Sequence, residues 1–534
     1  MPSLSQDATS PPMHISTLSR LDAWALSLGC ILGWGAYVMP GTTFLPMAGP
    51  AGTAMAMGLG CLLLLCIAIN FAYMMERRPE GCGSAYSYTR LVLGQDFAFL
   101  CAWAIGMAYL SLIWANATAF TLIARHLCGS VVQWGPQYSI LGYDVYFGEG
   151  LVSLTILVLF GLISAFGGRL VPRLQTVLVI VLLLAVTGCF SISFAKAGWQ
   201  FSAFAPAFAT GRPPVAQVLG IIGLIPWAFV GFESIAHSAG DFRFPVKKSL
   251  PIMVLAICTG AVVYIALTCL ATLAVPDCFA NWQEYVDSLD HLNGTTGLAT
   301  FNAAQNAMGD SGLILLGIAM LATLATSLLG FYRATARLIS TLAKDGLLPQ
   351  RLAVWQADGT PRAAVFAVMV LSAAVPFLGR ITIAWITDIS TICVSIAYLL
   401  TSACCWVLAQ NNKQRHIMFT GAMGVCIAAL AFIIPLVPNL WNSNTLTTES
   451  YLMLAAWSCS GLIAYHLAMW QGRQRHLGQS PLIWIVMLFL LFFAMGMWAK
   501  NVVYDAIDTA NKEITHIHSI GLGVDKPKIP ETNQ

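Results

Sequence analysis

The chain has 534 residues, of which 58% are hydrophobic and only 9% are charged. Soluble domains carry about 25% charged residues, so this composition excludes a soluble protein and predicts an all-α polytopic membrane protein. The formal net charge of +3 does not by itself indicate a binding partner. We expect no nucleic-acid partner. No nucleotide-binding loop, metal-ligand spacing or catalytic motif occurs in a suitable context, so we expect no enzyme activity, metal or cofactor.

Apolar stretches long enough to cross a bilayer recur along the whole chain. A membrane-spanning helix needs about 20 apolar residues, and thirteen segments approach or exceed this length, the fourth being short. The last could also be a re-entrant or peripheral helix, but we favour a true span, giving 12–13 transmembrane helices. The segments are 22–46, 50–75, 97–127, 151–167, 171–195, 216–241, 251–275, 311–334, 362–379, 381–410, 417–438, 450–470 and 481–499.

The loops between these segments differ in charge. Most of the 26 Lys and Arg residues fall in alternate loops, whereas the long loop 276–310 has acidic residues and neither Lys nor Arg. Basic residues are retained on the cytoplasmic side of membranes. The pattern therefore predicts a cytoplasmic N-terminus, an external loop 276–310 and insertion in the plasma or inner membrane.

Two of the apolar segments are interrupted near their centres. Gly33-Trp34-Gly35 breaks the first segment, while Pro226 and Gly231 break the sixth. Proline and glycine weaken a helix, and in a membrane the freed backbone groups must meet protein or line a polar cavity. Glu233 follows the second break, and a carboxylate at that depth marks a functional candidate. The alternative is a kinked packing helix whose glutamate bonds a neighbour.

The two interruptions lie five segments apart, which indicates inverted repeats made of segments 1–5 and 6–10. Transporters built in this way bind substrate where the broken helices meet. Half-helix N-termini present free N–H groups and a positive dipole end, which suit a carboxylate. We expect four regions: a cytoplasmic tail 1–19, a transport core 20–410, additional helices 411–499 and a tail 500–534.

Several motifs resemble the amino acid–polyamine–organocation (APC) superfamily of secondary transporters. The likeness extends over about residues 20–470 and lies in the combination of motifs. It implies a leucine-transporter-type fold with broken helices 1 and 6. The motifs are 33–41 in the first segment, 78–88 with Gly94 after the second, 227–233 in the sixth, 333–337 with 344–349 after the eighth, and 387–390 with Ala397 and Tyr398 in the tenth.

The resemblance also implies roles for individual residues. Backbone N–H groups of helix 1 would hold a substrate carboxylate, carbonyls of helix 6 would face its ammonium group, and aromatic side chains would act as gates. Glu233 would respond to protons. Trp114 and Asn116 on the third segment either line the pocket or pack, and we include Asn116 among the substrate-binding candidates. The implied positions are Gly33, Trp34 and Gly35 for the carboxylate, Trp227, Ala228 and Phe229 for the ammonium, and Trp227 and Phe331 for the gates.

Two positions depart from the family pattern. Trp34 replaces a serine between the glycines, which keeps the backbone N–H but should reshape the pocket. Leu182 stands where many sodium-independent members have a lysine on the fifth segment. Without that positive charge, exchange or coupling through Glu233 is favoured.

We therefore expect a secondary active transporter of an amino acid or amino-acid-derived amine, working by exchange or with a proton as partner. A membrane nutrient sensor is the alternative, although the short C-terminal tail offers no sizeable output domain. An ion channel would need polar stripes along several helices. Asp388 on the tenth segment is expected to have a structural role. Substrate identity, coupling and oligomeric state are left open by the residues.

Overall fold

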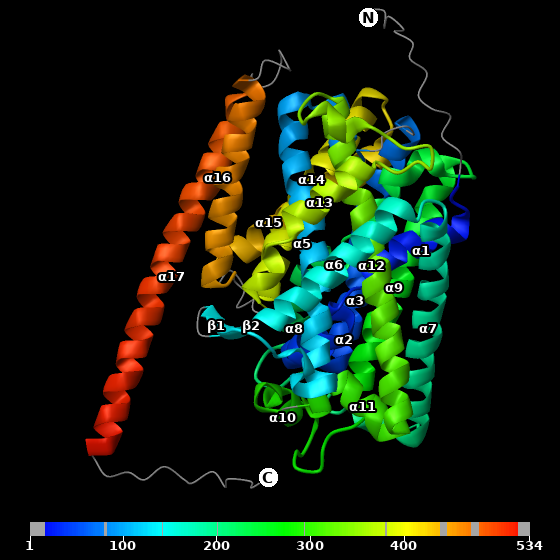
Figure 1. Ribbon diagram of the computed structural model, residues 1–534. Coiled ribbons are helices and arrows are strands. Elements are labelled where there is room, and N and C mark those ends of the chain that lie inside the picture. Colours follow the sequence, from blue (N-terminus) through cyan, green and yellow to red (C-terminus); the bar gives the residue numbers. More distant parts are fainter. Residues whose placement is uncertain are drawn as a thin grey trace, which may run out of the picture.

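The computed structural model describes residues 17–521 except 79–82, 141–142, 200, 293, 380–381, 438–445 and 471–479 (Figure 1). Part of the motif at 78–88 and most of the predicted N-terminal tail therefore lie outside the described residues. The α-helices are α1 (Arg20–Ile31), α2 (Gly35–Met39), α3 (Leu45–Arg77), α4 (Ala85–Val92), α5 (Gln95–Cys128), α6 (Phe147–Phe166), α7 (Leu170–Lys196), α8 (Pro214–Ala228), α9 (Ser249–Thr272), α10 (Trp282–Asp287), α11 (Ala299–Met308), α12 (Asp310–Lys344), α13 (Arg362–Ser372), α14 (Thr382–Asn411), α15 (Arg415–Leu436), α16 (Thr448–Trp470) and α17 (Pro481–Gly521).

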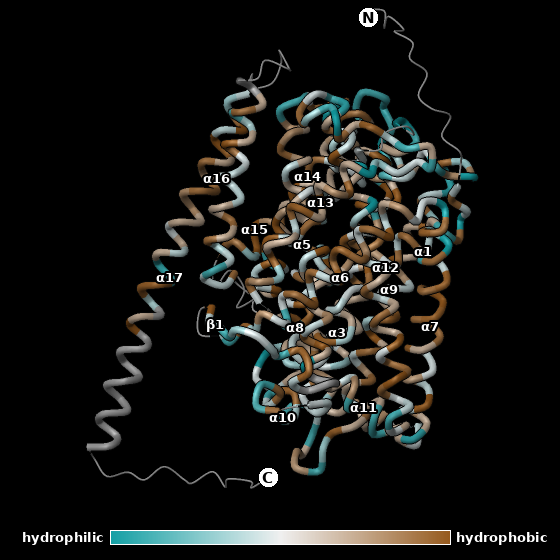
Figure 2. The backbone as a smooth tube through the Cα atoms, viewed as in Figure 1, coloured by the Kyte–Doolittle hydropathy of each residue, from teal (hydrophilic) through white to brown (hydrophobic). Residues whose placement is uncertain are grey.

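Among the described residues, 11 helices are long and apolar enough to cross a membrane. One of them, Gly35–Arg77, joins the second half of the first predicted segment to the second segment. The separate α1 and the shorter apolar helix Arg362–Leu378 account for the rest of the thirteen segments. Apolar residues surround the middle of the bundle, and polar residues gather at its two ends (Figure 2). The prediction of an all-α polytopic membrane protein is confirmed, while the inverted repeat stays a prediction.

The helices up to α15 form one bundle, and α16 and α17 pack together at its side (Figure 1). The indole Nε1 of Trp103 on α5 donates to the carbonyl of Trp457 on α16, at 3.2 Å. The hydroxyl of Tyr465 donates to Asp96 at 2.8 Å, again joining α16 to α5. These polar contacts attach α16 and α17 to the bundle. Apolar side chains alone would not fix this position, because they are about as stable against lipid as against another helix.

The thirteenth predicted segment corresponds to the first part of α17. Its candidate span is Pro481–Tyr504, so the segment is long enough to cross. The helix continues to Gly521, into the predicted C-terminal tail. At about 1.5 Å per residue, only its first part is needed to cross a hydrocarbon core of about 30 Å.

The two predicted interruptions are present in the backbone. The helix α1 begins with a capping box between Ser19 and Asp22 and ends at Ile31, and α2 starts at Gly35. A π-helical turn, η1 (Pro40–Phe44), follows α2. In the sixth segment, α8 ends at Ala228, and after the turn at 229–231 a 3-10 helix follows, η4 (Phe232–Asp241), whose 3-10 geometry sequence patterning did not predict.

Gly231 separates α8 from η4 because its conformation excludes other residues. Its φ of 107° lies in the left-handed region, which L-residues with a Cβ rarely adopt. A Cβ added there would lie 2.4 Å from the Cβ of Cys30 on α1. The glycine therefore permits both the turn and the close approach of the two broken segments.

The two ends of the bundle carry different loops. The loop after α12 lies with the chain's N-terminal segment, because Thr17 and residues 355–361 line one cavity. The helices α10 and α11, from the acidic loop 276–310, lie at the opposite end (Figure 1). A short antiparallel hairpin, β1 (Gln137–Ile140) and β2 (Tyr143–Tyr146), was not predicted. The remaining short 3-10 turns are η2 (Gly129–Val132), η3 (Phe201–Phe204), η5 (Val246–Lys248), η6 (Leu289–His291), η7 (Gly294–Gly297), η8 (Gln350–Ala353) and η9 (Val375–Leu378).

Candidate functional site

The two broken segments meet in the middle of the bundle. Tyr264 on α9 joins them, because its hydroxyl lies 2.9 Å from the carbonyl of Ala228 and 3.4 Å from that of Ile31. Ser27 on α1 donates to the carbonyl of Phe232 at 3.0 Å. The carbonyls released by both breaks are therefore partly satisfied by side chains, as burial requires.

The break in the first segment leaves backbone donors available. The N–H of Trp34 donates to Asn116 Oδ1 at 3.2 Å, and the other end of that amide donates to Ser327 Oγ at 3.0 Å. Within the described part of the chain, the N–H groups of Gly33 and Gly35 have no hydrogen-bond partner. Donors at the start of a helix are suited to an anionic group.

Side chains approach this backbone so closely that an added Cβ would have to displace them. A Cβ on Gly33 would lie 2.9 Å from Asn116 Oδ1, and one on Gly35 would lie 2.5 Å from the indole Cη2 of Trp227. Trp34 and Trp227 form an edge-to-face pair, with ring centroids 6.2 Å apart and planes at 62°. The Trp227 indole therefore lies directly on the first break, and such a pair contributes about 0.5–1.5 kcal/mol.

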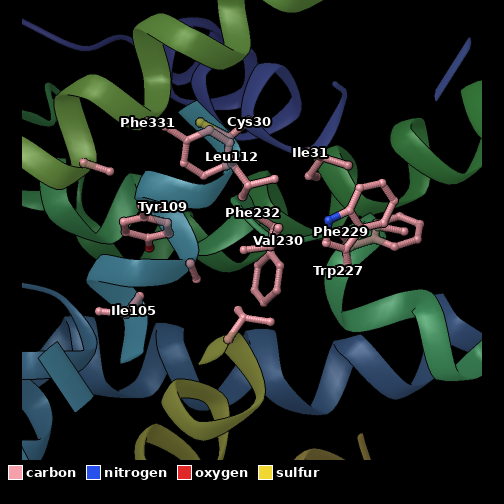
Figure 3. Close-up of a cluster of buried hydrophobic side chains, with 14 of the residues drawn as sticks. Cys30, Ile31, Ile105, Tyr109, Leu112, Trp227, Phe229, Val230, Phe232 and Phe331 are labelled. Carbon is pink, nitrogen blue, oxygen red and sulfur yellow. The ribbon is translucent and has the colours of Figure 1, made fainter. Parts of the chain in front are cut away.

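The predicted carbonyl side of the site is less open. Ala228 is buried, and its carbonyl accepts the Tyr264 hydroxyl. Phe229 is fully buried, with its ring centroid 5.7 Å from that of Tyr264. Figure 3 shows Trp227 and Phe229 beside Ile31 at the end of α1. A substrate ammonium group would compete with Tyr264 for the Ala228 carbonyl.

Glu233 is fully buried and accepts three hydrogen bonds. Its Oε1 accepts from the Tyr109 hydroxyl at 3.0 Å, and its Oε2 from the Tyr398 hydroxyl at 2.9 Å and the Gly231 N–H at 3.0 Å. No Lys or Arg forms an ion pair with it among the described residues. The carboxyl group thus joins the sixth segment to α5 and α14, and it also fixes the Gly231 turn.

Phe331 lies beside Tyr109, one of the two tyrosines that donate to Glu233. It is fully buried on α12, and its ring centroid is 5.4 Å from that of Tyr109, whose own ring lies 5.5 Å from His237 (Figure 3). Its neighbour Gly330 packs against Cys30. The predicted gating role of Phe331 would therefore act through Tyr109 and stays a prediction.

A charged cluster closes the N-terminal end of the bundle. Asp241, at the end of η4, accepts from Arg333 at 2.7 Å and from Arg337, both on α12. Arg337 also donates to the carbonyl of His237 at 2.9 Å. The backbone carbonyl of Asp241 accepts from the N–H groups of Thr17 and Leu18, at 2.9 and 3.0 Å. These contacts join the segment before α1 to η4 and α12, and we call them the Asp241 clamp.

Sequence reasoning missed several of these residues. Tyr109 and Tyr264 are ordinary aromatics within apolar segments, and only their partners reveal a role. Arg333 and Arg337 were noted as a family motif, but not as partners of Asp241. Asp388 behaves as expected of a structural residue, because its Oδ2 accepts from the Ser450 hydroxyl at 2.6 Å near the start of α16.

This architecture is that of a multi-pass, all-α membrane protein. Residues 18–465 match the model of the amino acid permease family, and the chain belongs to that family. Its relatives are transporters and permeases rather than enzymes.

Three relatives illustrate the range of the family. The chain is 26% identical to the methylthioribose transporter of Bacillus subtilis, over 84% of this chain and 93% of that protein. It is 25% identical to the branched-chain amino acid permease BcaP of the same organism, over 84% and 92%. It is 24% identical to the vacuolar cationic amino acid transporter 4 of Arabidopsis thaliana, over 74% and 64%.

Proposed function

We propose that this protein is a secondary active transporter of an amino acid or amino-acid-derived amine, working by alternating access. Residues 20–410 form the transport core as two inverted repeats, and the helices of 411–499 are accessory. The N-terminus is cytoplasmic and the protein lies in the plasma or inner membrane, which the distribution of basic residues supports.

The observation that carries this proposal is the pair of unpartnered donors at the first break. The N–H groups of Gly33 and Gly35 have no acceptor among the described residues, while Asn116 engages the N–H of Trp34 between them. A carboxylate can accept from both free donors at the positive end of α2. Unsatisfied donors are unfavourable in a membrane interior, so an anionic ligand is the natural partner.

Trp227 controls access to these donors. Its indole is 5% exposed and lies against Gly35, in the space that a carboxylate must enter. Binding therefore requires the indole to swing away, which would also release the edge-to-face contact with Trp34. Trp227 acts as the gate, and the bulk of Trp34 restricts the size of the ligand.

The Asp241 clamp holds the cytoplasmic end closed in this conformation. The segment before α1 is tied to the end of η4, and η4 is tied to α12 by two arginines. Opening towards the cytoplasm requires these contacts to separate. Alternating access then consists of releasing Trp227 on one side and the clamp on the other.

Glu233 is the candidate for proton coupling. It faces Tyr109 and Tyr398, with His237 beyond Tyr109, and it has no permanent positive partner among the described residues. A proton can therefore neutralise it without disrupting an ion pair. Three hydrogen-bond donors could instead make it a purely structural acceptor, in which case the protein is an exchanger.

Uptake and counterflow in proteoliposomes test the proposed function. The panel should contain branched-chain amino acids, cationic amino acids, their decarboxylated amines and methylthioribose, since relatives are named for several of these. We expect saturable transport of at least one amino acid or amine. Transport of methylthioribose alone would overturn the substrate class, and specific binding without any flux would favour the sensor alternative.

A further inference from the structure

A second cavity opens on the outer surface of the bundle, away from the site described above. It lies between the first turns of α1 and α9, which pack against each other, and has a volume of about 580 Å³. Its lining residues are Arg20, Leu21, Trp24, Lys248, Pro251, Ile252 and Leu255. The groove lies at the same end of the molecule as the Asp241 clamp, because Leu18, which belongs to the clamp, is only two residues before Arg20 at the start of α1.

The groove combines two kinds of surface. Arg20 and Lys248 are exposed and have no ion-pair partner among the described residues, so two positive charges face the groove without compensation. Leu21 and Leu255 are 51% and 55% exposed, which places apolar surface beside these charges. One such groove could receive a ligand that is anionic at one end and apolar along the rest.

A third feature also points to a ligand. The indole Nε1 of Trp24 is buried and has no hydrogen-bond partner in the described part of the chain. A buried donor without an acceptor is energetically unfavourable. If the indole turns towards the groove, a phosphate or glycerol oxygen there can accept from this N–H.

We propose that this groove binds one acidic phospholipid of the cytoplasmic leaflet. Its phosphate lies between the guanidinium of Arg20 and the ammonium of Lys248, and its acyl chains cover Leu21 and Leu255. The first turns of two membrane helices lie at the headgroup level, where basic side chains attract anionic lipids. A soluble phosphate would use the two cations but would leave the apolar surface uncovered.

The bound lipid would bridge two parts of the transporter. Arg20 begins α1, which follows the clamp segment, whereas Lys248 precedes α9. A headgroup that holds both cations opposes the separation of α1 from α9. Acidic lipid should therefore stabilise the conformation in which the clamp is closed.

The purified full-length chain in detergent, titrated with phosphatidylglycerol or phosphatidylcholine, tests this site by thermal unfolding and by native mass spectrometry of retained lipid. We expect phosphatidylglycerol to raise the Tm of the wild type and phosphatidylcholine to leave it unchanged. Arg20→Gln with Lys248→Gln should weaken the apparent affinity for phosphatidylglycerol at least tenfold. Trp24→Phe, which removes only the N–H, should weaken it about threefold.

The matched control is Arg351→Gln with Arg415→Gln, which removes two exposed charges outside the groove. It should bind phosphatidylglycerol as the wild type does, and an equal loss there would overturn the site in favour of general charge attraction. If glycerol phosphate raised the Tm as much as phosphatidylglycerol does, the groove would be a site for a free phosphate rather than a lipid, and the proposal would also be overturned. Should the double variant unfold, the single variants Arg20→Gln and Lys248→Gln must each lower the affinity. None of these outcomes depends on which substrate is transported.

Discussion

The two helix breaks serve the same architecture, but their backbone groups are satisfied in different ways. At the first break, Asn116 engages one N–H and those of Gly33 and Gly35 are left without a partner among the described residues. At the sixth-segment break, Glu233 accepts the Gly231 N–H and Tyr264 occupies the Ala228 carbonyl. The first break is therefore prepared for a ligand, while the second is held by the protein itself. Under the proposed function, this difference favours binding mainly at the first break, and gating and stability mainly at the second.

The largest effect on stability is expected at Gly231. Gly231→Ala introduces a Cβ 2.4 Å from that of Cys30 at a φ of 107°, so both the turn and the contact with α1 are strained. We expect a loss of roughly 2–5 kcal/mol, measured as a lower Tm in detergent. Gly223→Ala, on the same segment with no atom within 4 Å, is the control and should unfold like the wild type. Equal Tm values for both variants would contradict the account of this break.

Glu233→Gln separates the structural role of the carboxyl group from its coupling role. The amide keeps the shape, and the hydroxyls of Tyr109 and Tyr398 can rotate to bond it, so we expect the fold and substrate binding to survive. Since the amide cannot take up a proton, transport should slow strongly or lose its pH dependence. Proteoliposome uptake across a pH series measures this. A wild-type pH profile would end the coupling hypothesis and leave Glu233 as a structural acceptor.

Gly35→Ala should affect function rather than stability. The added methyl group would meet the end of the Trp227 indole, a side chain that can move, rather than backbone. We expect transport to fall about tenfold because the gate is displaced, since about 1.4 kcal/mol corresponds to that factor, with the Tm little changed. Gly58→Ala on α3, which has no atom within 4 Å, serves as the control for uptake and Tm. Unchanged uptake in Gly35→Ala would show that Trp227 does not gate this position.

The smallest effect is expected at Asn116. Asn116→Ala removes the acceptor that orients the Trp34 N–H, a hydrogen bond of about 1 kcal/mol, so substrate affinity should fall about threefold to tenfold. Ser327→Ala removes only one of the two acceptors of the amide Nδ2, which also donates to the Leu112 carbonyl at 2.8 Å, and should have a smaller effect. Competition binding in detergent compares the two variants. A larger loss for Ser327→Ala would place the ligand nearer to α12 than to the first break.

Sequence patterning predicted the features that depend on local chemistry. Runs of apolar residues gave the membrane helices, and glycine and proline within them located both breaks to within a few residues. The 3-10 geometry of η4 could not be predicted in this way, because a run of apolar residues does not show whether the backbone bonds every third or every fourth residue.

Contacts between distant residues were also beyond local patterns. The Tyr264 hydroxyl donates to two carbonyls that lie 36 and 233 residues away in the sequence. Asp241 accepts from Arg333, which lies 92 residues away. Asn116 was left open between lining and packing, and the structure places it against the backbone of the first break. Family motifs indicated where such residues gather, but tertiary packing decides which of them meet.

The central claim is that substrate binds at the first break, beneath Trp227 and beside Trp34. Uptake by Trp34→Ser across the full panel of amino acids and amines tests it most directly, because the change removes the indole that limits the pocket while keeping the backbone N–H. The account predicts altered selectivity, with larger substrates gaining relative to the native one or the native one binding more weakly. Constant selectivity ratios, with only the amount of expressed protein reduced, would contradict it.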